Sequence, residues 1–491
     1  MRDVVNMDGG GACTRPSPFP FPRTRTMTEI VTRKSIPVRD GDNTPPPKRP
    51  RKILTISDLH RMRQEQREFI KNNPPVNPPP FPFNLEEYKE TVTPVPLWSV
   101  VRQGAWKGRR CFVIGGGPSL KRFKWEKLAG ELTIGVNRVF EKFLPTMIFC
   151  MDARVWGWLE QGRFGSRARE RFKDFPGYKV WVDNSTYLFP PEERIYVVGG
   201  LEPHGGNSGH AAVNLAVKLG ANPVYLLGFD MKGDGKGGQK WWHDGYPELQ
   251  EEGVYEYYIR AFTDTAWRYR DAGVDVVNLT PRSALKCFPT DKFSNVVRTP
   301  KRKPLVVTYC TPGYRGLVDR WKRSVHRQGL EWYVEEIPDR GGWRENTRYK
   351  PTFMKQVIDR TGKDVVWLDV DGVACAYPDL FVDAKFDIGF VTVDWSKYST
   401  VARNDVEALS GTVFVRNSRV GREFLTAWER ELERDRELVD AVAMAVVSKR
   451  FRYESLPPTY CKIFDTMMDT PGEAVFEHFQ ASRVLRHGGA L

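Results

Sequence analysis

Short, mostly apolar runs alternate with longer segments of helical periodicity from Trp98 onward. Apolar runs of four or five residues predict strands that are buried on both faces, and their alternation with helices predicts a parallel sheet covered by helices. We therefore expect a Rossmann-like α/β domain over residues 96–300. Its expected strands lie at 111–114, 132–136, 178–182, 195–198 and 224–227, and its expected helices at 208–219 and 252–272.

A second series of strands and helices follows a polar, basic segment at residues 299–304. Its last part, from residue 388 to 491, has the pattern of a mixed sheet. The series predicts a second α/β domain over residues 301–491. Its expected strands lie at 305–309, 332–336, 365–368 and 388–393, and its expected helices at 314–328, 351–361, 419–434 and 439–449.

Residues 1–95 have a different composition. Three proline clusters remove backbone donors and favour an extended, solvated chain. One helix is expected here, from an N-cap at Ser57 to about Lys71. A basic string at residues 48–52 fits a nucleic-acid contact or a nuclear address, and it fits a solvated run of charge equally well. The pattern predicts a disordered arm before the two domains.

Composition narrows the functional class. The chain has 491 residues and a formal net charge of +14, which favours an anionic partner such as nucleic acid or a nucleotide. Its seven cysteines are scattered and form no C-x-x-C pair, which argues against a disulfide framework or a structural zinc site. No apolar run approaches the roughly 20 residues of a membrane helix. We expect a soluble cytoplasmic protein with no membrane partner, in the host cytoplasm if it is viral.

Two carboxylates follow the apolar run at 365–368. Asp369 and Asp371 stand one residue apart, and Gly372 then lets the backbone turn. Carboxylates at a buried strand end are costly unless a positive group neutralises them. A divalent cation that carries a nucleotide diphosphate would do so, because hard cations prefer oxygen ligands. The alternative is a solvated turn that closes the strand.

A glycine-rich segment, residues 115–120, follows the first predicted strand and leads into a helical stretch. Backbone N–H groups at such a turn can cradle a phosphate, although the segment is neither a G-x-G-x-x-G nor a Walker A sequence. A purely structural tight turn is the alternative. Asn137, Asp152 and Ser208 follow later strands or open a helix, so that they converge at the carboxyl edge of the sheet, where ligands bind.

This order of motifs resembles a superfamily that includes bacterial sialyltransferases and the domain similar to 6-hydroxymethylpterin pyrophosphokinase. The resemblance covers residues 105 to 290 and implies a nucleotide site and a general base at His243, beside two tryptophans. A packing role is the alternative for this histidine. The tyrosine pair of the sialyltransferases is not recognisable, which leaves the reaction of this domain open. The implied nucleotide-binding residues are Gly115, Gly117, Pro118, Ser119, Asn137 and Ser208.

Residues 303–491 resemble a compact GT-A nucleotide-diphospho-sugar transferase, through the strand at 305–309, the Lys350-Pro351 helix start, the Asp-x-Asp strand and the segments at 410–417 and 477–483. The resemblance implies that Thr308 and Tyr309 bind the nucleotide and that Asp369, Asp371 and His478 hold Mn²⁺ or Mg²⁺. A buried core histidine is the alternative for His478. Asp440 resembles the aspartate of an acceptor-side Asp-Gln motif, with Ala441 in place of the glutamine.

The leading hypothesis is therefore a metal-dependent glycosyltransferase with two transferase-like modules. It would move a sugar from a nucleotide-sugar donor to a hydroxyl acceptor. The charge and the basic arm make a hydroxymethylated base in phage or viral DNA the first acceptor to test. Two alternatives stay open: pyrophosphate transfer to a small alcohol by the middle domain, and a degenerate scaffold that binds nucleic acid. The oligomeric state and the stereochemical outcome stay open too.

Overall fold

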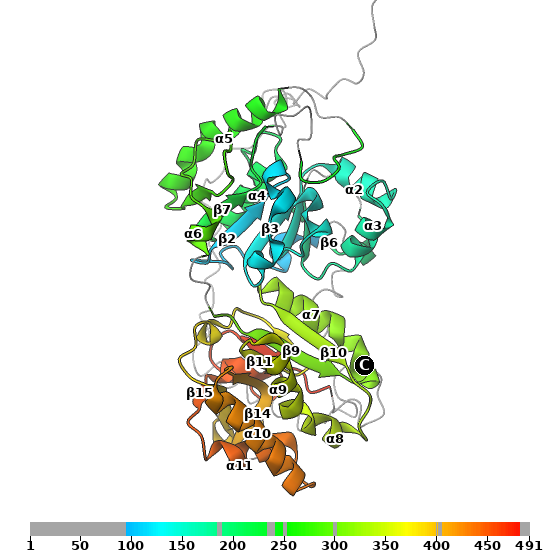
Figure 1. The fold of residues 1–491 in the computed structure, drawn as a ribbon, viewed down its shortest axis with the longest axis vertical. Coiled ribbons are helices and arrows are strands. Elements are labelled where there is room, and N and C mark those ends of the chain that lie inside the picture. The colour runs from blue at the N-terminus through cyan, green and yellow to red at the C-terminus, as the bar shows by residue number, and fades with distance from the viewer. Residues whose placement is uncertain are drawn as a thin grey trace, which may run out of the picture. The chain divides into compact units, whose positions relative to one another are not determined.

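The computed structural model describes residues 95–183, 189–232, 241–248, 253–297, 302–398, 400 and 405–481. The predicted arm and its helix from Ser57 lie outside these residues. Two separate large sheets are present, one in each predicted domain (Figure 1). We call residues 95–297 the first module and residues 302–481 the second module. Among the described helices, none combines the length and apolar character needed to cross a membrane.

The first module contains an eight-stranded sheet in which every strand pair is parallel. Its central strands are fully buried, as their apolar runs predicted. In spatial order, the strands are β1 (Val95–Pro96), β6 (Ile195–Val198), β5 (Tyr178–Val182), β4 (Met147–Cys150), β3 (Leu132–Val136), β2 (Cys111–Ile114), β7 (Val224–Leu227) and β8 (Val276–Asn278).

Helices cover both faces of this sheet. The helices α4 (Ser208–Lys218) and α5 (Val254–Asp271) pack on one face, and α2 (Ala153–Glu160) and α3 (Ser166–Lys173) contribute to the core on the other. A short helix, α6 (Phe293–Val296), follows the last strand. The helical stretch predicted after the glycine-rich segment is instead two short 3₁₀ helices, Pro118–Arg122 and Trp125–Leu128.

The second module contains a six-stranded mixed sheet. Strands β10, β9 and β11 are parallel to one another, β14 runs antiparallel to β11 and β13, and β15 is parallel to β13. The predicted fold class, a parallel α/β sheet followed by a mixed one, is confirmed. In spatial order, the strands are β10 (Trp332–Glu336), β9 (Leu305–Cys310), β11 (Val365–Leu368), β14 (Val406–Val415), β13 (Ile388–Asp394) and β15 (Glu454–Leu456).

A small three-stranded sheet carries part of the candidate site, and its first strand follows β11 closely in the chain. It consists of β12 (Gly372–Ala374), β17 (Phe476–His478) and β16 (Lys462–Ile463). Helices α9, α10 and α11 pack on one face of the mixed sheet, and α7 packs on the other. The helices are α7 (Val318–Arg327), α8 (Trp343–Arg348), α9 (Lys350–Thr361), α10 (Arg419–Arg434) and α11 (Asp440–Ser448).

Candidate functional site

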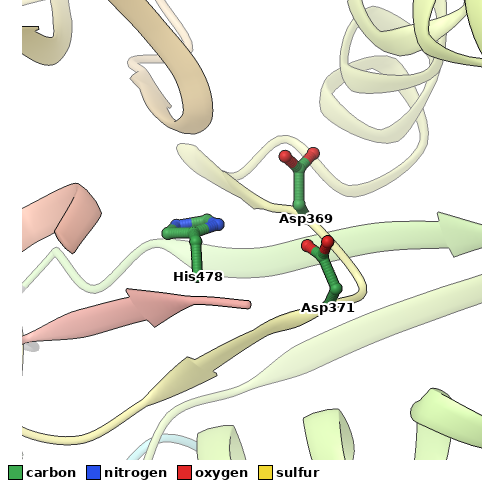
Figure 2. A group of neighbouring side chains, drawn as sticks. All are labelled: Asp369, Asp371 and His478. Atoms are coloured by element: carbon green, nitrogen blue, oxygen red, sulfur yellow. The ribbon is translucent and has the colours of Figure 1, made fainter. Parts of the chain in front are cut away.

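Three predicted metal ligands come together in the second module. Asp369 and Asp371 lie in the turn between β11 and β12, and His478 is the last residue of β17. Strand β17 pairs antiparallel with β12 and sets Gly372 opposite His478. One ligand atom from each of the three residues lies within 4.8 Å of the others. Figure 2 shows both carboxylates and the imidazole around this turn.

One side-chain atom of each candidate ligand is already held by the protein. Trp367 Nε1 donates to Asp369 Oδ1 at 2.7 Å, and the Ala481 N–H donates to Asp371 Oδ2 at 2.7 Å. His478 Nε2 shares a 2.9 Å hydrogen bond with Thr412 Oγ1. Such contacts orient a ligand and leave its other donor atom for a cation.

Two glycines allow the imidazole of His478 to come this close. A Cβ atom at Gly411 would lie 2.9 Å from His478 Cε1, and one at Gly372 would lie 3.1 Å from the same atom. Any other residue at these positions would displace the ring or the backbone. The glycines therefore serve the approach of His478 as well as the turn after β11.

The electrostatics of the three residues suit a cation. Burial lowers the pKa of His478 from 6.5 to about 4, although the charge of Asp369 opposes this, so the ring is neutral near pH 7 and can donate a lone pair. Burial, and next the charge of Asp369, raise the pKa of the Asp371 carboxyl. A bound divalent cation would relieve this repulsion, and two carboxylates with one imidazole fit Mn²⁺ or Mg²⁺.

A cavity of about 380 Å³ lies beside this cluster, and both carboxylates and His478 line it. Tyr309, at the end of β9, lines it as well, and its hydroxyl donates to the Asn346 carbonyl at 2.6 Å. Thr308 is fully buried within the strand. Aromatic and polar side chains share the wall, as is usual for a small-molecule site. They include Thr311, Tyr314, Trp343, Asn346, Trp367, Ser410 and Asp440.

Lys350 contacts both the candidate metal ligand Asp369 and Asp440, and the sequence alone does not predict this position. It is the first residue of α9 and is only 2% exposed. Its Nζ atom lies 3.1 Å from Asp369 Oδ1 and 2.7 Å from Asp440 Oδ2. Burial alone would lower the pKa of Lys350, but the charges of the two carboxylates outweigh it and raise the pKa. Lysine is seldom fully buried without paired charges. The burial of Lys350 is therefore explained by the two carboxylates that it contacts.

The first module has a second cavity of about 510 Å³ at the carboxyl edge of its sheet. Four of the predicted nucleotide-binding residues line it: Gly115, Gly117, Asn137 and Ser208. Ser119 makes a different contact, because its N–H and Oγ both donate to the Asp230 carboxylate, at 3.2 and 2.8 Å. Pro118 opens the 3₁₀ helix that contains Ser119. The structure thus brings four of the six residues to one cavity.

His243, the predicted general base, is buried next to the glycine-rich segment. Its ring is stacked on Trp241 with centroids 5.9 Å apart, and its Nδ1 atom accepts a hydrogen bond from the Gly245 N–H at 3.1 Å. Its Nε2 atom is buried and has no hydrogen-bond partner among the described residues. Burial, and next the charge of Arg138, lower its pKa to about 3. The ring is therefore neutral near pH 7.

Comparisons with known proteins give weak likenesses. No protein-family model and no curated protein match the chain. Similar solved structures include a glycosyltransferase involved in the glycosylation of the major capsid of PBCV-1, at 15% identity and a TM-score of 0.28, over 36% of this chain and 93% of that one. The WbbM bifunctional glycosyltransferase has 12% identity and a TM-score of 0.28, over 49% of this chain and 57% of that one.

A third similar structure is the Maf glycosyltransferase from Magnetospirillum magneticum AMB-1, at 15% identity and a TM-score of 0.28. The match covers 53% of this chain and 44% of that one. TM-scores this low carry no argument about the fold or activity of this chain. The proposals below therefore rest on the residues of the two cavities.

Proposed function

We propose that the second module is a glycosyltransferase that uses a nucleotide-sugar donor and a divalent cation. The observation that carries this proposal is the cluster of Asp369, Asp371 and His478 on the wall of a partly aromatic cavity. When bound there, Mn²⁺ or Mg²⁺ would neutralise the diphosphate that leaves the sugar. Each ligand has one donor atom fixed by a neighbouring group, so the three are oriented before a cation arrives.

The residues that line the cavity have two proposed roles. Tyr309 and the aromatic residues after β9 supply flat surfaces for the nucleotide. Asp440 also lines the cavity, at the start of α11, and is the proposed catalytic carboxylate for the acceptor hydroxyl. Its Oδ2 atom is held by Lys350 and Ser410, so its position is fixed.

The acceptor is proposed from charge. The net charge of +14 favours a polyanion, so DNA that contains a hydroxymethylated pyrimidine is the first acceptor to test.

For the first module we propose nucleotide binding, because Gly115, Gly117, Asn137 and Ser208 line its cavity. His243 is the proposed base there, since its neutral ring lies against this loop.

The test is a panel of nucleotide sugars, each incubated with Mn²⁺ or with a chelator. Release of the nucleotide is measured, and mass spectrometry detects transfer to DNA nucleosides and to small alcohols. Asp369→Asn and Asp371→Asn should each lower donor turnover at least about 100-fold, the loss seen when one group that stabilises developing charge is removed. Asp359→Asn is the matched control, because that carboxylate pairs with Arg422 on the surface.

Each result has a defined meaning. Donor turnover that survives both Asn substitutions would overturn the metal-dependent mechanism. Turnover with no transfer to any DNA would overturn the DNA acceptor and leave the transferase activity in place. Binding of nucleotide that Asn137→Ala does not weaken would overturn the nucleotide site of the first module.

A further inference from the structure

The ammonium group of Lys350 has all its hydrogen-bonding capacity committed to one small set of oxygens. Besides Asp369 and Asp440, it donates to the Ser410 carbonyl oxygen at 3.0 Å. An ammonium has three N–H donors, and four oxygens surround it here, because Ser410 Oγ also lies 3.3 Å away. The Lys350 side chain is sealed from solvent at 2% exposure, whereas 35% of the Asp369 side chain is exposed. Lys350 itself lines the cavity, although its side chain is almost entirely buried, and it contacts the candidate metal ligands through Asp369.

Asp440 is held from several directions at once. Ser410 Oγ donates to the same Asp440 oxygen that Lys350 contacts, at 2.7 Å. Trp428 Nε1 donates to the Asp440 carbonyl at 2.9 Å. Asp440 also opens α11, where the helix dipole favours a negative charge. The carboxylate therefore has little freedom to follow Lys350 if the ammonium moves.

One positive charge is consequently shared between two carboxylates. Asp369 is a proposed metal ligand, and Asp440 is the proposed acceptor-side group. If either carboxylate lost its charge, the ammonium would interact more strongly with the other, since little solvent reaches it to compensate. A single side chain therefore links Asp369 to Asp440.

We propose that Lys350 is a positioning residue that couples the cation site to Asp440. Lys350 shares its positive charge between Asp369 and Asp440. The negative charge of Asp440 therefore strengthens the affinity of the cluster for a divalent cation. This inference rests on the proposed metal site of the second module. When a neutral residue replaces Asp440, Lys350 interacts more strongly with Asp369 and weakens cation binding. With Lys350 absent, Asp440 loses this influence.

The test is a double-mutant cycle read by Mn²⁺ affinity, measured by isothermal titration calorimetry on the full chain. Asp440→Asn should raise the Kd for Mn²⁺ about fivefold or more when Lys350 is present, a coupling typical of residues in one ion-pair network. In the Lys350→Met background the same substitution should change the Kd less than about twofold. Lys355→Met is the matched control on α9, because Lys355 pairs with Glu429.

An equal factor for Asp440→Asn in both backgrounds, or no effect in either, overturns the coupling. So does a wild-type chain that binds no Mn²⁺. Lys350→Met leaves two carboxylates unneutralised, and thermal unfolding by circular dichroism checks that it folds. If it does not, Lys350→Gln replaces it, since the amide keeps a donor without the charge.

Donor turnover measured on the same preparations separates this inference from the proposed function. Turnover of a nucleotide sugar without the coupling overturns the role of Lys350 and keeps the transferase. Coupling without turnover of any nucleotide sugar keeps the role of Lys350 and overturns the transferase.

Discussion

The Nε2 atom of His478 lies 2.9 Å from the hydroxyl oxygen of Thr412, which belongs to the central part of strand β14. Because β17 is a short strand in a different sheet, this hydrogen bond anchors the imidazole to the main sheet of the module. It also determines which ring nitrogen is left for a cation.

Thr412→Val should therefore weaken Mn²⁺ binding about 10-fold or more, the loss typical of an outer-shell partner of a metal ligand. The substitution keeps the shape of the side chain and removes the hydroxyl, so the ring loses its orientation. Calorimetric titration with Mn²⁺ measures the effect. Thr392→Val is the control, because Thr392 on β13 forms a hydroxyl hydrogen bond to Ser455 on β15, and neither residue belongs to the cluster. An unchanged Kd for Thr412→Val would show that the bond does not orient the ligand.

Gly411→Ala should have a similar effect for a steric reason. Its Cβ would lie 2.9 Å from His478 Cε1 and 3.0 Å from Nδ1, so the ring must shift from its position in the cluster. We expect about 10-fold weaker Mn²⁺ binding, of the order lost with an outer-shell contact. Gly313→Ala is the control, since a Cβ there would meet nothing within 4 Å. Equal Kd values for the two alanine variants would contradict the prediction.

Gly117→Ala should destabilise the first module by about 1–3 kcal/mol, as overpacking does. The added Cβ would lie 1.9 Å from Asp230 Oδ2 and 2.5 Å from the Gly228 carbonyl oxygen. The Asp230 carboxylate must therefore move, which breaks its hydrogen bonds from Ser119. Urea unfolding followed by tryptophan fluorescence measures the loss. Gly116→Ala, one residue earlier, should be milder, because its nearest neighbour is a Trp241 side-chain atom at 3.3 Å. A larger loss for Gly116→Ala would reverse this interpretation.

Stability should fall in acid partly through His210. Burial, and next the charge of His204, lower the pKa of His210 from 6.5 to about 4. Between these values the unfolded chain binds a proton that the folded protein does not, so the free energy of unfolding decreases as the pH falls. From about pH 7 to pH 5 the contribution is about 2 kcal/mol. His210→Gln should remove this contribution. The free energies of unfolding of wild type and variant should therefore differ less at about pH 5 than at about pH 7.

The comparison uses urea unfolding of both proteins at each pH. Glutamine can still reach the Thr265 hydroxyl that lies 3.0 Å from His210 Nε2, which limits other losses. A constant difference between the two proteins across this pH range would contradict the prediction. The buried histidines His326 and His478 have pKa values lowered in the same direction, so some acid sensitivity should persist in the variant.

Much of this fold follows from local sequence patterns. The apolar run Val365–Leu368 and the amphipathic helix Arg419–Arg434 occur with the bounds predicted from their periodicity. The prediction of a helical stretch after the glycine-rich segment was wrong, because the chain forms two separate short 3₁₀ helices there. Short segments give little periodicity from which to tell the two kinds of helix apart.

The candidate ligands that directly follow or end a strand could be predicted from the sequence. Contacts between residues far apart in the chain could not. Asp369, Asp371 and His478 could be placed together because their motifs match one family pattern. Lys350 could not, because a lysine at a helix start has the pattern of a surface residue, and only the fold brings Asp440 to it. Likewise, the contact between Ser119 and Asp230 depends on a residue far along the chain.

Strand β11 lies between β9 and β14, and all four of its residues are buried. Its backbone amides should therefore be among the slowest in the second module to exchange with deuterium, because they open only when the sheet itself opens. Asp369 follows directly from this strand and its own N–H donates to Gly411 in β14. The carboxylate is thus carried by a part of the chain that loses little motion when a ligand arrives, which lowers the entropic cost of binding.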